Sequence, residues 1–240
     1  GPVRHPRRRQ QERPARSPAG DVGAGAAGQV VKALPPLADQ DVVVLALPRG
    51  GVPIGAIIAE ALNAPLDLVL VRKVGAPRNP ELAIGAVTGP GDAGLVVNTP
   101  VARLFGMTRA DVDALATPER TELNRRRRAY LGDRPPVPVA GRTVVLVDDG
   151  IATGTTLRAA LASLRRMRPG RVILAVPVAS ADVLDDLRGA VDQLICPVPR
   201  LQFGAVGAAY RQFDQVTAAE VQRLMRKALP RRNAGAGPNP

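Results

Sequence analysis

Two adjacent carboxylates, Asp148 and Asp149, follow an apolar run and are the clearest candidates for chemistry in this sequence. Residues 144–147 are valine or leucine, and residues 150–156 are glycine, isoleucine, alanine and threonine. The apolar run predicts a buried strand, and the small residues after it predict a tight turn into a helix. Two carboxylates at such a strand end repel each other. We therefore expect them to hold a cation, neutral hydroxyl groups or a positive charge that develops during a reaction.

The turn after the carboxylates is suited to an anion. Backbone amides at a helix N-terminus lack partners within the helix, and the helix dipole adds partial positive charge there. Small side chains let an anion approach, and threonine hydroxyls add donors. The lysine of a Walker P-loop is absent. A sugar phosphate fits this pattern, with its phosphate in the turn and its ribose hydroxyls on the aspartates. The alternative is that the paired acids cap a helix or bind a stray cation.

The scarcity of histidine and cysteine excludes several kinds of site. The one histidine, His5, lies in an arginine-rich N-terminal stretch, so a Ser-His-Asp triad, a Cys-His pair and a His-ligated zinc site are not expected. One cysteine, Cys196, excludes a disulfide framework and is consistent with a reducing cytoplasm. No apolar run reaches about 18 residues, and no apolar stretch follows Arg7–Arg9, so we expect neither a membrane span nor a secretory signal. The expected location is cytoplasmic.

The net charge of +12 raises the question of a nucleic-acid partner. Part of the charge is the run Arg125–Arg128, within a predicted helix. Aromatic residues make up only 2% of the chain, so rings that could stack on bases are scarce. A solvated helix face is the favoured interpretation of this run, and nucleic-acid binding is not expected. Phosphates on a small substrate would also suit the positive charge.

Apolar runs alternate with helical patterns along the middle of the chain. Strands are predicted at 42–48, 66–72, 143–148, 171–178 and 191–198. Helices are predicted from Val52 to about Asn63, from Thr108, from Thr117 to about Tyr130, after Thr156 and after Thr217. Strands that are apolar on both faces and joined by helices indicate a Rossmann-like α/β fold, a parallel sheet flanked by helices. Residues 74–94, rich in glycine and proline, are predicted to form a mobile loop.

The two ends of the chain differ in composition from the middle. Residues 1–28 are rich in proline, glycine, alanine and arginine, and they predict a disordered basic tail. Residues 231–240 predict a second disordered tail. The segment 23–28, GAGAAG, matches a dinucleotide-binding fingerprint, but no strand precedes it, so we reject that function. The predicted domain spans 29–230.

The stretch VVLVDDGIATGTT at 144–156 resembles the PRPP-binding signature of type I phosphoribosyltransferases. LPRGGVPIG at 47–55 is similar to the pyrophosphate loop of the same family, and it lies in the expected order along the chain. The resemblance implies that Arg49, Gly50 and Gly51 bind pyrophosphate. It also implies a non-proline cis peptide bond, which by position falls between Pro48 and Arg49.

The segment VRKVGAPRNPELAIGAV at 71–87 resembles the mobile catalytic loop of this fold. The resemblance implies that Arg72 and Lys73 reach the pyrophosphate leaving group and that Arg78 closes over it. These segments, together with 203–221, are similar to a bacterial branch whose members are sometimes fused to hydrolase domains. Residues 199–216 are predicted to form part of a small hood over the acceptor. Phe203 and Tyr210 are predicted to stack on that acceptor, with ordinary core packing as an equal alternative.

The resemblance implies a Mg²⁺-dependent transferase, a glycosyltransferase of nucleotide metabolism, that moves 5-phosphoribosyl from PRPP to a nucleobase or related heterocycle and releases pyrophosphate. Asp148 and Asp149 would hold the ribose hydroxyls and, indirectly through those hydroxyls or water, the metal. The 5′-phosphate would contact Ile151, Ala152, Thr153, Gly154 and Thr155. Two alternatives remain: a PRPP- or nucleotide-sensing regulator that binds nucleic acid through basic surface, and a degenerate partner subunit. The fold often dimerises, so a homodimer is one assembly that it allows.

Overall fold

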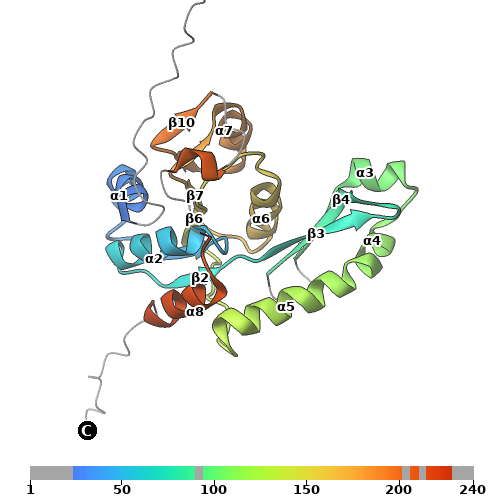
Figure 1. Cartoon of the computed structure of the whole chain (residues 1–240), viewed down its shortest axis with the longest axis horizontal. Helices are drawn as coiled ribbons and strands as arrows, with labels where there is room; N and C mark the ends of the chain where they lie inside the picture. The colour runs from blue at the N-terminus through green and yellow to red at the C-terminus, as the bar shows by residue number, and fades with distance from the viewer. Residues whose placement is uncertain (1–23, 90–93, 202–205, 211–214, 229–240) are drawn as a thin grey trace, which may run out of the picture.

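The computed structural model describes residues 24–89, 94–201, 206–210 and 215–228 of the chain (Figure 1). At its centre is a five-stranded parallel sheet in the order β2-β1-β6-β7-β9. In that order the strands are Leu66–Leu68, Val42–Ala46, Thr143–Val147, Arg171–Ala175 and Gln193–Ile195. The predicted Rossmann-like α/β class is confirmed.

Helices cover both faces of this sheet. α1 (Ala24–Ala33), α2 (Gly51–Ala61) and α8 (Ala218–Lys227) pack on one face, and α6 (Thr155–Arg166) and α7 (Ala181–Leu187) pack on the other. Along β1, Val42 and Val44 belong to the first core, whereas Val43 and Leu45 belong to the second. Successive strand residues point to opposite faces, so a strand between two helix layers must be apolar throughout. This explains the uninterrupted apolar runs in the sequence.

An arm projects from one side of the sheet, at the right of Figure 1. Its antiparallel sheet contains β3 (Val71–Ala76), β4 (Asn79–Thr88) and β5 (Leu95–Val97). α3 (Thr99–Leu104), α4 (Arg109–Leu115) and α5 (Thr117–Leu131) complete the arm and share a separate apolar core with the three strands. The helix predicted from Thr108 is confirmed, and it begins with a capping box: the Thr108 side chain accepts from the Asp111 amide, and the Asp111 side chain accepts from the Thr108 amide.

The arm corrects two predictions. The run 66–72 is not one strand, because it divides into β2 and β3 at residues 69–70. The segment 74–94 is not a mobile loop over its described part, because most of it forms the β3–β4 hairpin. Its glycines allow close approach of neighbouring strands: a Cβ on Gly75 would lie 2.6 Å from the Pro80 oxygen, and one on Gly85 would lie 2.7 Å from the Val96 oxygen. Glycine content predicted flexibility, but here it permits tight packing.

The beginning of the described chain also differs from the prediction. Residues 24–28, expected in a disordered tail, form the first half of α1. Ala26, Ala27 and Val30 of this helix are buried, and α1 packs against α2. Alanine is the strongest helix former, and its small side chain suits close packing. The rest of the predicted N-terminal tail and all of the predicted tail at 231–240 lie outside the described residues.

A smaller element stands beyond the ends of the main strands. β8 (Val178–Ser180) and β10 (Val198–Arg200) form a parallel pair, and short 3₁₀ helices occur at Arg188–Ala190 and Val206–Ala209. Most of β10 and all of the second 3₁₀ helix belong to the predicted hood segment 199–216, of which 202–205 and 211–214 are not described. In the described part of the chain, no helix is both long enough and apolar enough to cross a membrane.

A buried ion pair joins α5 to the edge strand β2. Asp67 is 2% exposed, and its carboxylate accepts from both terminal nitrogens of Arg127 at 3.3 Å. The backbone amides of Leu68 and Val137 also donate to Asp67, at 2.8 and 2.9 Å, and Arg134 lies 3.7 Å away. The run Arg125–Arg128 is therefore not simply a solvated face, because Arg127 is only 7% exposed.

We predict that Asp67→Asn lowers the free energy of unfolding by about 3–5 kcal/mol, because it leaves the Arg127 charge buried without its partner. Chemical denaturation measures the effect. Asp185→Asn is the matched control: it breaks an ion pair with Arg188 whose side chains are 72% and 68% exposed, and we expect almost no change in stability. Equal losses in the two variants would contradict the structural role of the Asp67 pair.

Candidate functional site

A cleft of about 350 Å³ lies where β1 and β6 end. Parallel strands that share an edge bring the segments after them together, and such an edge is the usual ligand site of open α/β sheets. Four parts of the chain line the cleft: the loop after β1, the junction of β2 and β3, α5, and the segment after β6. The lining residues are Leu47, Pro48, Arg49, Gly50, Val69, Leu70, Val71, Arg72, Leu123, Arg126, Tyr130, Asp148, Asp149 and Thr156.

The predicted carboxylates lie together in this cleft. Both are half-buried, and the Asp149 amide donates to Asp148 Oδ1 at 2.9 Å. Burial raises the pKa of the Asp148 carboxyl well above its usual range, and the nearby Asp149 charge raises it further. Burial also raises the pKa of Asp149. Among the described residues, neither carboxylate forms an ion pair with a lysine or arginine. The pair is therefore suited to an external cation or to hydroxyl groups.

The glycine loop after β1 packs directly against these carboxylates. The Pro48–Arg49 peptide bond is cis, as the resemblance implied. A Cβ on Gly50 would stand 1.7 Å from Asp149 Oδ2, and one on Gly51 would stand 2.7 Å from the Val147 oxygen. Gly51 thus requires glycine because it packs on the backbone at the end of β6, and a side chain at Gly50 would displace the Asp149 carboxylate. Arg49 is exposed and lines the cleft.

The turn after the carboxylates enters α6 through Gly154, whose φ is 72°. The backbone amide of Ile151 is not available to a ligand, because it donates to the Val178 oxygen. The Ile151 oxygen accepts from the Ser180 amide. The amides from Ala152 to Thr155 have no hydrogen bond to another described residue. Arg158 donates to the Thr153 oxygen at 2.9 Å and pairs with Asp186, which braces the turn. The donors that remain for an anion are these amides and exposed threonine hydroxyls, including Thr156, which sequence reasoning did not assign.

The three predicted basic residues of the arm have different positions. Arg72 lines the cleft and pairs with Glu119 of α5. Lys73 is exposed and is not among the cleft-lining residues; neighbouring strand residues point to opposite sides. Arg78 sits at the β3–β4 turn with φ 63°, about 20 Å along the hairpin from Arg72 at 3.3 Å per residue. The structure therefore brings only Arg72 to the cleft.

Tyr210 does not have the predicted position for an acceptor platform. Its side chain is buried among Ala26, Val178 and Val206, and its hydroxyl donates to the backbone oxygen of Asp149. Burial raises the pKa of this hydroxyl. Tyr210 thus contacts the backbone of the carboxylate turn and is not among the residues that line the cleft. Phe203 lies outside the described residues.

Sequence reasoning missed the contribution of α5. Leu123, Arg126 and Tyr130 line the cleft and share one helix face at the spacings i, i+3 and i+7. That periodicity was visible in the sequence, but nothing local indicated which structure the face meets.

The acidic groups also limit how a metal could bind. Within the described ranges, no group of three or more His, Cys, Asp or Glu side chains is placed to hold an ion. The Asp148–Asp149 pair fits a cation such as Mg²⁺, which keeps several waters and uses one or two carboxylates together with substrate phosphates.

The raised carboxylate pKa has a measurable consequence. Asp148 has a higher carboxyl pKa in the folded state than in the unfolded state. The free energy of unfolding therefore falls as the pH rises through the pKa of the folded state, because the folded protein must then hold the charged carboxylate. We predict that Asp148→Asn melts at a higher temperature than the unchanged protein at about pH 8, and that the difference shrinks toward about pH 4. Thermal melts across this range measure it. A difference that does not depend on pH would contradict the assignment.

Three comparisons with known proteins identify the family of this chain. The family model for the phosphoribosyl transferase domain matches residues 17–210. Two curated Mycobacterium tuberculosis proteins, from strains CDC 1551 / Oshkosh and H37Rv and both named provisionally as phosphoribosyl transferases, are 40% identical over 210 residues. The match covers 87% of this chain and 46% of each relative, so the chain spans about half their length.

A solved structure is similar over most of both chains. The crystal structure of TT1426 from Thermus thermophilus is 40% identical, has a TM-score of 0.74, and is matched over 85% of this chain and 95% of that chain. The range 17–210 contains the cleft, the carboxylate pair and the cis-peptide loop. This chain therefore belongs to the phosphoribosyl transferase domain family.

Proposed function

We propose that this protein transfers 5-phosphoribosyl from PRPP, with Mg²⁺, to a nitrogen of a nucleobase or related heterocycle and releases pyrophosphate. One observation carries the proposal: two half-buried carboxylates lie between a turn with unpartnered amides and a cis-peptide glycine loop. PRPP has a phosphate, vicinal hydroxyls and a diphosphate in the same order.

The residues would act mainly by positioning and electrostatics. The amides of the 152–155 turn would hold the 5′-phosphate, and Asp148 and Asp149 would accept hydrogen bonds from the ribose hydroxyls. As the bond from C1 to the diphosphate oxygen breaks, its electron pair leaves with the diphosphate. The acceptor lone pair then forms the new bond to C1, and the proton that this nitrogen carried passes to water or to the released diphosphate. Positive charge develops on C1 between these events, and the paired carboxylates stabilise it. Bound Mg²⁺ would neutralise the departing diphosphate.

The alternative of a regulator that binds nucleic acid receives less support. Arg127 is buried against Asp67, and Arg125 and Arg126 both pair with Glu122. The arginine run is therefore divided among different contacts, and it is not a continuous basic face of the kind that follows a phosphate backbone. A homodimer stays a prediction.

We predict that the double variant Asp148→Asn/Asp149→Asn loses about 100-fold or more of its pyrophosphate release, because transition-state charge goes unstabilised. The assay measures pyrophosphate from PRPP and Mg²⁺ with a panel of heterocycles. A thermal melt of the variant separates lost chemistry from lost folding. Full turnover by a folded double variant with any acceptor would contradict the mechanism.

We predict that Gly50→Ala weakens PRPP binding about tenfold or more, because the new methyl group displaces the Asp149 carboxylate. Calorimetric titration with PRPP and Mg²⁺ measures the affinity. Gly189→Ala is the matched control, since a Cβ there meets nothing within 4 Å. An unchanged affinity in a folded Gly50→Ala protein would show that Asp149 does not hold the ribose.

A further inference from the structure

We propose that Arg126 of α5 is a diphosphate-binding residue of the cleft. This inference rests on the proposed use of PRPP at the same site. Arg126 lies outside the PRPP-binding signature at 144–156 and the pyrophosphate loop at 47–55, and it belongs to a helix whose arginine run predicts only surface charge.

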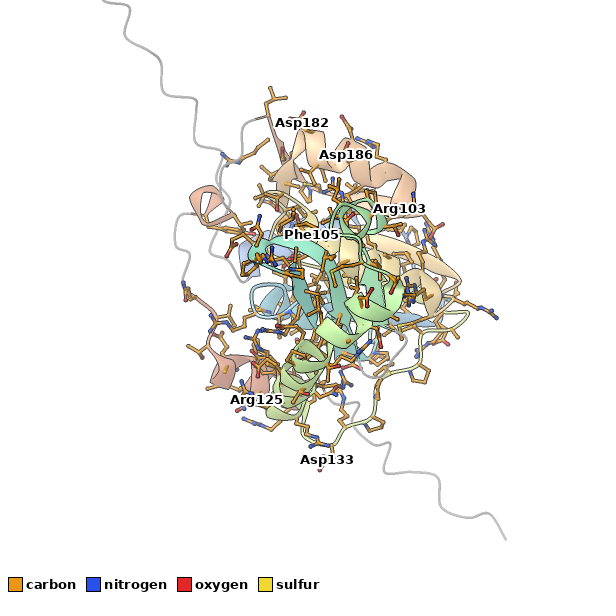
Figure 2. All side chains as sticks on the ribbon, turned by 90° about the vertical axis from the view of Figure 1, so that its right-hand side faces the viewer. Arg103, Phe105, Arg125, Asp133, Asp182 and Asp186 are labelled. Carbon is orange, nitrogen blue, oxygen red and sulfur yellow. The ribbon has the colours of Figure 1, made fainter. Side chains whose placement is uncertain are left out.

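The four arginines of the run lie on different faces of α5, because successive helix residues are turned by about 100°. Arg127 is buried against Asp67. Arg125 is 69% exposed, makes two hydrogen bonds to Glu122 and does not line the cleft; Figure 2 labels it at the periphery of the molecule. Arg126 alone of the four lines the cleft. The run thus combines a structural contact, outward charge and one residue that faces the site.

The donors of Arg126 suit an anion in that cleft. Its Nε donates to Glu122 Oε1 at 2.9 Å, and neither of its terminal nitrogens has a hydrogen-bond partner among the described residues. The side chain is 47% exposed, so a ligand can reach it. A guanidinium has five donors in a planar fork that matches phosphate oxygens. The neighbouring Arg127–Asp67 contact holds this turn of α5 against β2 and so limits the movement of Arg126.

The surrounding charge favours the diphosphate over the 5′-phosphate. The cleft is lined by three arginines from three elements: Arg49 from the glycine loop, Arg72 from β3 and Arg126 from α5. The turn that is suited to a monophosphate, 152–155, belongs to the segment between β6 and α6 and contributes amides and hydroxyls instead of guanidinium groups. The more highly charged end of PRPP is its diphosphate, and we place that end at the three arginines.

The test compares Arg126→Gln with Arg125→Gln. These two residues are adjacent, both pair with Glu122, and only one of them lines the cleft. Calorimetry measures the affinities of three probes: inorganic pyrophosphate with Mg²⁺, PRPP with Mg²⁺, and ribose 5-phosphate. We expect Arg126→Gln to weaken the first two about tenfold or more and to leave ribose 5-phosphate within about twofold. Arg125→Gln should leave all three within about twofold.

A second variant, Arg126→Lys, keeps the positive charge but lacks the planar guanidinium group. We expect it to bind pyrophosphate more tightly than Arg126→Gln and less tightly than the unchanged protein. If Arg126→Gln binds pyrophosphate and PRPP as tightly as Arg125→Gln does, the inference is wrong while the proposed function stands. Equal weakening of ribose 5-phosphate would also overturn the assignment to the diphosphate. If the unchanged protein binds neither PRPP nor pyrophosphate, the proposed function fails as well.

Discussion

The approach of Gly50 to Asp149 is the constraint on which the site depends. β1 and β6 pair in parallel from Val42 opposite Thr143 to Ala46 opposite Val147, so the segments that follow them emerge side by side. There is no room for a side chain between them: a Cβ on Gly50 would overlap the Asp149 carboxylate. The glycine loop and the carboxylate pair therefore pack directly against each other, which restricts the positions open to both. This rigidity is what positional catalysis requires.

The same packing has a cost in stability. Two carboxylates are partly withdrawn from water next to each other, without a basic partner among the described residues, and burial raises both pKa values. Such an arrangement works against folding and persists where a ligand uses it. Tyr210 offsets part of this cost, since its hydroxyl donates a hydrogen bond to the Asp149 backbone oxygen. Tyr210, in the segment 199–216 that is predicted to form part of a hood, thus contributes to holding the carboxylate turn.

α5 shows how one helix can serve both structure and site. Its buried Arg127 joins it to β2 through Asp67, and its face with Leu123, Arg126 and Tyr130 closes the cleft. The helix also packs on β3 and β4, the strands of the arm to which it belongs. Through α5 the arm is linked to the wall of the cleft, and Arg72 of β3 pairs with Glu119 of the same helix.

Much of the site could be predicted from sequence because its signals are local. An apolar run, two acids and a turn of small residues occupy consecutive positions, and a backbone phosphate cradle needs little beyond such a segment. The central strands and the helix start at Thr108 were predicted from local patterns in the same way, whereas the cis bond after Pro48 was implied by the family resemblance. Two predictions that were based on amino-acid composition alone were wrong. Glycines in the 74–94 segment lie in tightly paired strands, and the alanines of 24–28 are helical.

The sequence by itself determined the fold class and the residues suited to hold a sugar phosphate. Only the tertiary structure decided which distant side chains complete the cleft. Arg126 and Tyr130 reach it because α5 crosses beside β2 and β3, whereas Arg78 is carried away at the tip of the hairpin. Tyr210 reaches the backbone oxygen of Asp149 for the same kind of reason. Local patterns show the chemistry of a residue and the side of the helix or strand on which it lies. What that side packs against depends on contacts between segments far apart in the chain.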